Sequence, residues 1–320
     1  MTELFEQEIL TVVRLHGEAF GVAKQDVCRL AFLGEGENHR NVLLRTDRHR
    51  VVFRISLRQP EGASDPFYEF QGLRLLPPDL GPVPLWFDGS RGVLPHPFSV
   101  LSYVEGEPRL QWSNGDLRRH ARQLARLHAT RFDKAGPVGA NEGRYDPCAF
   151  HRAIPESYGP LLADDLELGA LFSEVGHYLA ERAGLFARLN HYSLVHFDLY
   201  AGNVLFDRQG QARFIDWEWM QIADNAEDLA RFYHHGFGFP PWYIKMSRDS
   251  LVRFMDEYRR SLGGDDTLEH RVEALHVYYT FADLIYFRNA AVEAVASDRN
   301  LRRYQEVSHA LTATLKEALQ

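Results

Sequence analysis

The sequence is poor in cysteine and basic residues, and it has no long apolar run. Its only cysteines, Cys28 and Cys148, make neither a disulfide framework nor a metal-binding pair. Acidic residues outnumber basic ones by 44 to 36, which argues against nucleic acid or a membrane surface as a partner, because both require a basic face. No window approaches the roughly 20 apolar residues that cross a bilayer, and the opening MTELFEQEIL lacks the basic segment of a secretion signal. We therefore expect a cytoplasmic protein.

What is present is a globular composition, with 45% hydrophobic and 25% charged residues. Short runs rich in β-branched and apolar residues occupy 28–57 and 83–104 and are separated by turn residues. Such runs predict antiparallel strands. Between them, FYEFQGLRLL (67–76) has the character of a helix and ends before two prolines. The first hundred residues thus predict a small antiparallel sheet with one inserted helix.

A change of pattern follows Glu105-Gly106-Glu107-Pro108, which has the composition of a linker. Helical spacing then dominates, with helices expected near 117–129, 164–188 and 225–236, and a short strand-rich island at 193–217 interrupts them. We therefore predict an α+β fold with an N-terminal lobe (1–104), a hinge (105–110) and a larger, mainly helical lobe (111–320).

The strand-rich island carries the polar residues that indicate chemistry. His196, Asp198 and Asn203 form the pattern H-x-D-x-x-x-x-N, and Asp216 follows 13 residues after Asn203. Two apolar strands, VLF and RFI, flank a polar turn between them, so a hairpin is expected. This order and spacing match the catalytic segment of enzymes that transfer phosphoryl groups.

Phosphoryl transfer explains why these residue types are needed. A carboxylate orients the acceptor hydroxyl and takes its proton, and Mg²⁺ bridges the phosphates of ATP. Mg²⁺ prefers oxygen ligands and keeps several waters, so one Asn and one Asp are enough to hold it. We expect Asp198 to be the catalytic base, His196 to brace its loop by hydrogen bonding, and Asn203 and Asp216 to be the metal ligands.

With these motifs the chain resembles the aminoglycoside phosphotransferase and choline kinase superfamily between about residues 27 and 235. The segments HFDLYAGN and IDWE match family motifs, and in ADNAEDLA (223–230) Asp224 and Asp228 match two family acids. Ala223 and Asn225 replace the Gly and Pro of that motif. The resemblance implies a two-lobed protein-kinase-like fold, and it implies that Asp224 and Asp228 support the catalytic loop.

The resemblance also assigns the nucleotide side to the N-terminal lobe. Gly34, Gly36 and Asn38 match a loop whose backbone approaches phosphates, because glycine has no Cβ. Arg54 stands where the family template has a lysine, and Glu69 is its expected partner. A further expected contact is the hinge backbone, which bonds adenine in the family; here this is the segment that contains Ser102 and Val104.

The acceptor site is less defined in the sequence. Between residues 153 and 180 there are acids but no lysine or arginine, and the acids include Asp164 and Asp165. They suit either an amine-bearing acceptor or a solvated helix face. Trp217 and Glu218 suit either an acceptor pocket or structural packing. The expected partner is a small hydroxylated molecule, with a cationic one among the alternatives; aminoglycosides, choline-like alcohols, homoserine and sugars fit by resemblance. No pattern in the sequence predicts the oligomeric state.

Two other functions compete with an ATP- and Mg²⁺-dependent small-molecule kinase. A catalytically weak nucleotide-binding sensor, or a partner-binding module on the same fold, would account for Arg54 and for the altered turn at Ala223 and Asn225. A metal-dependent hydrolase would use the His, Asp and Asn residues but leaves the glycine loop without a role. Because Asp198, Asn203 and Asp216 are all present, the kinase is the favoured hypothesis.

Overall fold

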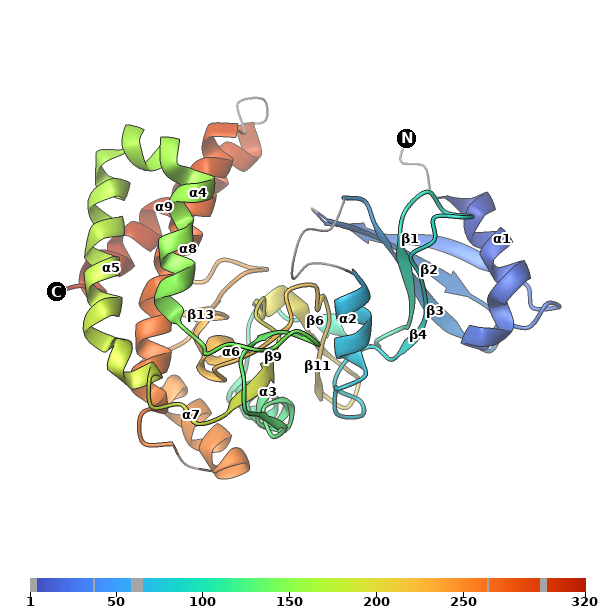
Figure 1. Ribbon diagram of the computed structural model, residues 1–320, viewed down its shortest axis with the longest axis horizontal. Coiled ribbons are helices and arrows are strands. Elements are labelled where there is room, and N and C mark those ends of the chain that lie inside the picture. The colour runs from blue at the N-terminus through green and yellow to red at the C-terminus, as the bar shows by residue number, and fades with distance from the viewer. Residues whose placement is uncertain (1–4, 37, 59–65, 264, 294–297) are drawn as a thin grey trace.

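A five-stranded antiparallel sheet occupies one end of the molecule (Figure 1). The computed structural model describes residues 5–36, 38–58, 66–263, 265–293 and 298–320. The sheet order is β1-β2-β3-β5-β4, with β1 (Arg29–Glu35), β2 (His39–Arg45), β3 (Arg50–Ser56), β4 (Pro84–Asp88) and β5 (Phe98–Ser102). The expected antiparallel sheet is confirmed.

Two helices cover this sheet on different sides. Helix α1 (Glu6–His16) and the short η1 (Gly17–Phe20) lie on its outer side, where Ile9 and Val12 share a hydrophobic core with the buried residues of β2, β3 and β5. Helix α2 (Pro66–Leu73), the predicted insertion between β3 and β4, lies between the sheet and the rest of the chain (Figure 1). Its Phe70 and Leu73 belong to the second hydrophobic core of the molecule, so α2 links the sheet to the helical part.

Helices dominate after the sheet, as the spacing of apolar residues predicts. They are α3 (Asn114–Leu127), α4 (Pro147–Asp164), α5 (Leu166–Phe186), α6 (Ala226–Ala230), α7 (Arg248–Leu262), α8 (Leu268–Glu293) and α9 (Asp298–Ala318). Helices α4, α5, α8 and α9 gather at the end of the molecule opposite the sheet (Figure 1). None of the described helices is long and apolar enough to cross a membrane.

Short strands lie between the sheet and this helical end. They include β6 (Glu107–Pro108), β7 (Arg131–Phe132), β8 (Gly136–Pro137), β9 (Tyr192–Val195), β10 (Val204–Phe206), β11 (Ala212–Phe214), β12 (Gln221–Ala223), β13 (Tyr233–His234) and β14 (Ile244–Lys245), with a turn of 3₁₀ helix, η3 (Ala201–Asn203), ahead of β10. Strands β10 and β11 form the expected hairpin. The predicted linker is part of the folded structure, because its strand β6 pairs with β10. Gly106 is required there: its φ is 139°, and a Cβ would lie 3.0 Å from the Phe206 carbonyl oxygen.

Two helix predictions were incomplete. Helix α4 was missed because Pro155 and Pro160 lie inside it and proline opposes helix interiors; the helix tolerates them with a kink, where Tyr158 leaves helical geometry. The helix expected at 225–236 ends at Ala230, and the chain continues into β13, which pairs with β14. A tertiary partner that lies eleven residues further along the chain cannot be recognised from local periodicity.

Candidate active site

The loop that follows β9 carries the predicted catalytic pattern, and a buried carboxylate holds its shape. Asp228 of α6 accepts hydrogen bonds from the backbone N–H groups of His196 (2.8 Å) and Phe197 (2.9 Å). Phe197 adopts a left-handed conformation with φ of 68°. The His128 ring lies 3.2 Å from the same carboxylate. Burial opposes ionisation of Asp228, but these partners outweigh it and lower the pKa, so a fixed negative charge anchors the loop.

His196 lies beneath this loop rather than in a cavity. Its side chain is fully buried, and its Nε2 lies 2.9 Å from the Ile215 carbonyl oxygen. Its ring packs against Trp217, with ring centroids 4.4 Å apart. This is the bracing contact that the sequence predicted. It ties the Asp198 loop to the segment that contains Asp216.

Asp198 is partly buried, and this burial opposes ionisation of its carboxyl. Burial raises the pKa of its carboxyl to about 6, and Arg231 acts in the opposite direction. The guanidinium of Arg231 lies 4.0 Å from the carboxylate and donates hydrogen bonds to the Phe197 carbonyl and the Tyr200 hydroxyl. Asn203 Nδ2 donates to the Asp198 carbonyl at 2.8 Å. Asp198 is thus held from both sides, with a pKa that suits proton exchange near neutral pH.

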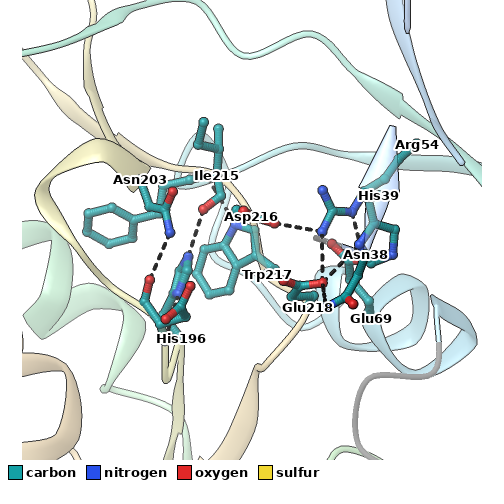
Figure 2. A network of polar contacts seen from close by, with 12 residues as sticks. Asn38, His39, Arg54, Glu69, His196, Asn203, Ile215, Asp216, Trp217 and Glu218 are labelled. Atoms are coloured by element: carbon teal, nitrogen blue, oxygen red, sulfur yellow. Dashed lines mark hydrogen bonds and ion pairs between the residues drawn. The ribbon is translucent and has the colours of Figure 1, made fainter. Parts of the chain in front are cut away.

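Asp216 follows β11 and meets the sheet through Arg54 (Figure 2). Its backbone φ is 66°, and its carboxylate lies 2.6 Å from Arg54 Nη2. Arg54 Nε also donates to Glu69 of α2 at 3.0 Å. Burial opposes ionisation of Asp216, but Arg54 outweighs it and lowers the pKa. The expected Arg54–Glu69 pair is present, and Arg54 also bridges to Asp216.

The glycine loop approaches the same region from the other side. Asn38 Nδ2 donates to Glu218 at 3.1 Å, and His39 Nδ1 lies 2.9 Å from the same carboxylate (Figure 2). Open space surrounds the positions where Gly34 and Gly36 would carry a Cβ. Glycine at these two positions therefore leaves room for a ligand to approach the backbone. Glu37 lies outside the described residues.

A cavity of about 290 Å³ lies between the glycine loop and the hinge, where Gly34, Arg54, Ser102 and Val104 line it. The Ser102 hydroxyl accepts a hydrogen bond from the Val83 N–H at 2.8 Å, so that side chain holds the hinge strand in place. Within the described residues, the backbone N–H of Val104 has no backbone acceptor. This amide is available to a flat heterocycle that enters the cavity.

A second cavity of about 590 Å³ contains Asp198, Asn203 and Glu218. Arg54 and Asp216 line both cavities, so the two meet at that ion pair. Helix α8 forms part of the wall with residues for which the sequence analysis had no role: Tyr278, Asp283, Tyr286 and Phe287. Asp283, the acid in the run YYTFADLIYF (278–287), could have indicated this wall from the sequence. A charged residue within an apolar helix requires polar partners when it is buried.

A third and larger hollow, of about 860 Å³, lies beside the hinge and holds none of the predicted catalytic residues. Among its charged residues, Arg50 contacts Glu105, and Arg213 contacts Asp207. The two cavities that meet at Asp216 are therefore the better candidate site, since Asp198, Asn203 and Arg54 line them.

Several predicted site residues lie elsewhere. Trp217 is fully buried, and its Nε1 donates to the Phe214 carbonyl, so it is a core residue and not part of an acceptor wall. Asp164 ends α4, and Asp165 caps α5 by accepting from the Leu168 N–H; neither lines the cavity of Asp198.

The remaining predicted residues hold the structure together at a distance from the cavities. Asp224 does not touch the catalytic loop and is instead paired with Arg271 of α8 at 2.7 Å. On α5, Glu167 is paired with Arg288 and Lys316. Glu167, one of the acids of this segment, therefore faces other helices and not the cavity of Asp198.

The donor set suits Mg²⁺ bound with phosphates. Asn203 uses its Nδ2 in the loop, which leaves its amide oxygen, and the lowered pKa of Asp216 keeps that carboxylate ionised. Both residues line the cavity that contains Asp198. Among the described residues no cluster of three or more His, Cys, Asp or Glu side chains forms a protein-only metal cage. Two oxygen ligands supplemented by phosphates and water are what Mg²⁺ requires.

Solved structures with the same fold span nearly the whole chain. A choline kinase from Cryptosporidium parvum Iowa II is 16% identical with a TM-score of 0.65, covering 98% of this chain and 96% of its own. The streptomycin–ATP–APH(2″)-IIa ternary complex is 15% identical with a TM-score of 0.63, covering 98% and 99%.

A thermostable mutant of aminoglycoside phosphotransferase APH(4)-Ia, in complex with AMP-PNP and hygromycin B, is 17% identical with a TM-score of 0.60 and covers 94% and 98%. These likenesses confirm the two-lobed protein-kinase-like fold. No curated protein matches the sequence. The phosphotransferase enzyme family model, however, matches residues 29–274, and the chain therefore belongs to that family.

Proposed function

We propose that this protein is an ATP- and Mg²⁺-dependent kinase that phosphorylates a hydroxyl group of a small molecule. One observation carries the proposal: the hinge cavity and the cavity of Asp198 meet at Arg54 and Asp216. A nucleotide in the first cavity would direct its phosphates toward Asp216, and an acceptor in the second would present its hydroxyl to Asp198. The order of groups is the one that in-line phosphoryl transfer needs.

The nucleotide side uses backbone and charge. The Val104 amide is suited to donate to the adenine ring, and Gly34 and Gly36 leave space for phosphates at the mouth of the cavity. Arg54 supplies positive charge and is held by Glu69. Asn203 and Asp216 would hold Mg²⁺, which neutralises charge on the phosphates when bound. We infer that residues 1–104 form the nucleotide-binding lobe, 105–110 the hinge, and 111–320 the lobe with the catalytic loop and acceptor site.

The chemical step uses Asp198. The acceptor oxygen forms a bond to the γ-phosphorus, the bond from that phosphorus to the bridging oxygen of ADP breaks, and the acceptor proton passes to Asp198. The carboxylate positions the hydroxyl. Arg231 and Asn203 hold the loop that carries Asp198, so that the carboxylate stays next to this hydroxyl. The pKa of about 6 leaves most Asp198 ionised at pH 7 while keeping it basic enough to accept a proton.

The test separates binding from transfer. Calorimetry measures ATP binding with and without Mg²⁺, and a coupled assay measures ADP release with hydroxylated acceptors. We expect Asp198→Ala to retain Mg²⁺-dependent ATP binding and to lower acceptor-dependent turnover by about 10²–10⁴-fold. Full turnover in that variant would refute the role of Asp198. Nucleotide binding by the wild-type protein with no acceptor-dependent ADP release would favour the sensor hypothesis.

A further inference from the structure

A hollow of about 330 Å³ lies where helices α3 and α7 pack against each other (Figure 1). Its lining consists of Gly115, Arg118, Arg119 and Arg122 of α3 with Glu257 and Arg260 of α7. We call it the arginine hollow. None of these residues lines the hinge cavity or the cavity of Asp198. The hollow gathers four guanidinium groups around one carboxylate in a chain whose formal net charge is −8, so its local charge is opposite in sign to that of the whole protein.

Glu257 is shared among the arginines of the hollow and cannot neutralise all of them. One of its oxygens lies 2.6 Å from Arg122 Nε, and the other lies 3.1 Å from Arg260 Nη2. The hydrogen bond from Arg122, together with the charges of Arg260 and Arg118, lowers the pKa of Glu257, so this carboxylate carries a single negative charge at neutral pH. Arg118 itself forms no ion pair with any of the described residues. Three guanidinium groups therefore depend on one carboxylate.

Arg119 and the start of α3 add N–H donors that lack acceptors. The Nη2 of Arg119 lies 3.0 Å from Asp116, but Asp116 also contacts Arg109, so here too one carboxylate serves two guanidinium groups. The Nε–H of Arg119 is buried and has no hydrogen-bond partner in the described part of the chain. The N–H of Gly115, in the first turn of α3, has no backbone acceptor there either. N–H groups in the first turn of a helix favour anions.

The charge and the size of the hollow define the kind of anion that fits it. Guanidinium groups bind phosphate through paired N–H donors. Four guanidinium groups against one carboxylate leave three positive charges in excess, which a single phosphate balances only in part. Small-molecule pockets begin at roughly 300 Å³, so a hollow of about 330 Å³ holds a few linked phosphates. Nucleic acid requires a longer basic face than these two helices provide, on a protein without net negative charge.

We propose that the arginine hollow is a binding site for a small polyphosphate anion, a molecule that carries two or three linked phosphate groups. The phosphates lie between the guanidinium groups of Arg118, Arg119 and Arg122 on α3 and that of Arg260 on α7. The N–H of Gly115 is a further donor to them. This site is separate from the two cavities of the proposed kinase reaction, and binding there does not depend on that reaction.

The test measures anion binding by calorimetry in buffer without Mg²⁺. The probes are sodium tripolyphosphate, inorganic phosphate and a short single-stranded RNA. The first variant carries Arg118→Gln and Arg122→Gln together. The control is Arg126→Gln, which removes the same charge from the same helix but lies outside the hollow. All three arginines are exposed, so the variants should fold, and denaturant unfolding verifies this. Mg²⁺-ATP binding is measured separately for each protein.

We expect tripolyphosphate to bind about tenfold more tightly than inorganic phosphate, because it engages several guanidinium groups at once. The double variant should weaken tripolyphosphate binding by about tenfold or more and leave Mg²⁺-ATP binding unchanged, and Arg126→Gln should change neither. Three results overturn the inference: no binding of tripolyphosphate at millimolar concentration, the same affinity in the double variant as in the wild type, or an affinity for inorganic phosphate or RNA that equals or exceeds that for tripolyphosphate. Absence of Mg²⁺-ATP binding by the wild-type protein would instead overturn the kinase proposal.

Discussion

The replacement Asp228→Asn tests how the catalytic loop is held. Asp228 is fully buried and accepts from the backbone N–H groups of His196 and Phe197, and it also contacts His128. Asparagine keeps the size of the side chain but removes its charge, and it turns one acceptor into an N–H₂ donor. That donor faces a backbone N–H or the His128 ring, so at least one buried hydrogen bond is lost.

The magnitude follows from these contacts. A hydrogen bond to a charged group contributes about 1.5–3 kcal/mol, and breaking a buried ion pair costs about 3–5 kcal/mol. Because asparagine retains one acceptor oxygen, we expect the free energy of unfolding to fall by about 3 kcal/mol. The lowered pKa of Asp228 means that its contribution is present above the unfolded pKa and is lost as pH falls. The difference between wild type and variant should therefore begin to shrink below about pH 4 and disappear only once the pH falls below the lowered pKa of the folded state.

Denaturant unfolding at pH 7 and at about pH 3, below the unfolded pKa of an aspartate, measures this difference. Acceptor-dependent ADP release reports on the loop. Turnover should fall with little change in Mg²⁺-ATP binding, since Asp228 lies outside both cavities. Glu306→Gln is the control, because its ion pair with Arg302 is exposed to solvent. A loss of stability in Asp228→Asn no greater than in this control, or one independent of pH, would refute the reasoning.

Three further predictions concern buried charge and polarity. Burial raises the pKa of Glu227 to about 7, so its contribution to stability is present at acid pH and is lost as pH rises through 7. The replacement Glu227→Gln should flatten this pH dependence of the free energy of unfolding, which denaturant unfolding at pH 5 and pH 8 measures. His120 is buried among aromatic rings, and neither of its ring nitrogens has a hydrogen-bond partner within the described residues. Because a buried polar group without a partner is destabilising, His120→Phe should raise the free energy of unfolding by about 1 kcal/mol in denaturant titrations. Asp216→Asn should weaken Mg²⁺-dependent ATP binding in calorimetry, and unchanged Mg²⁺ dependence would contradict its proposed role as a ligand.

Much of the candidate site was readable as a local pattern. The H-x-D-x-x-x-x-N segment and Asp216 are close in sequence, and the hairpin between them is predicted by alternation and a polar turn. Glu69 could be proposed as the partner of Arg54 because a family template exists. The structure contains that pair, with Nε and carboxylate 3.0 Å apart.

For other residues the sequence left two interpretations open, because composition does not say where a side chain points. Asp165 and Asp164 appeared to form an acidic face, yet Asp165 caps α5 and is paired with Arg288, which lies 123 positions further along the chain. Trp217 appeared suited to a pocket but packs in the core against His196. An exposed aromatic and a buried aromatic have the same sequence signal.

The sequence by itself determined the α+β class, the antiparallel sheet, and the position of the H-x-D-x-x-x-x-N segment and Asp216 around a hairpin, because these depend on periodicity and short spacing. Only the tertiary structure decided what surrounds them. Arg231 and the α8 residues Tyr278 and Asp283 reach the cavity of Asp198 from distant parts of the chain. Burial and pairing then set the pKa of Asp198 and leave Trp219 exposed. Such properties arise from the packing of distant segments, and no local pattern encodes them.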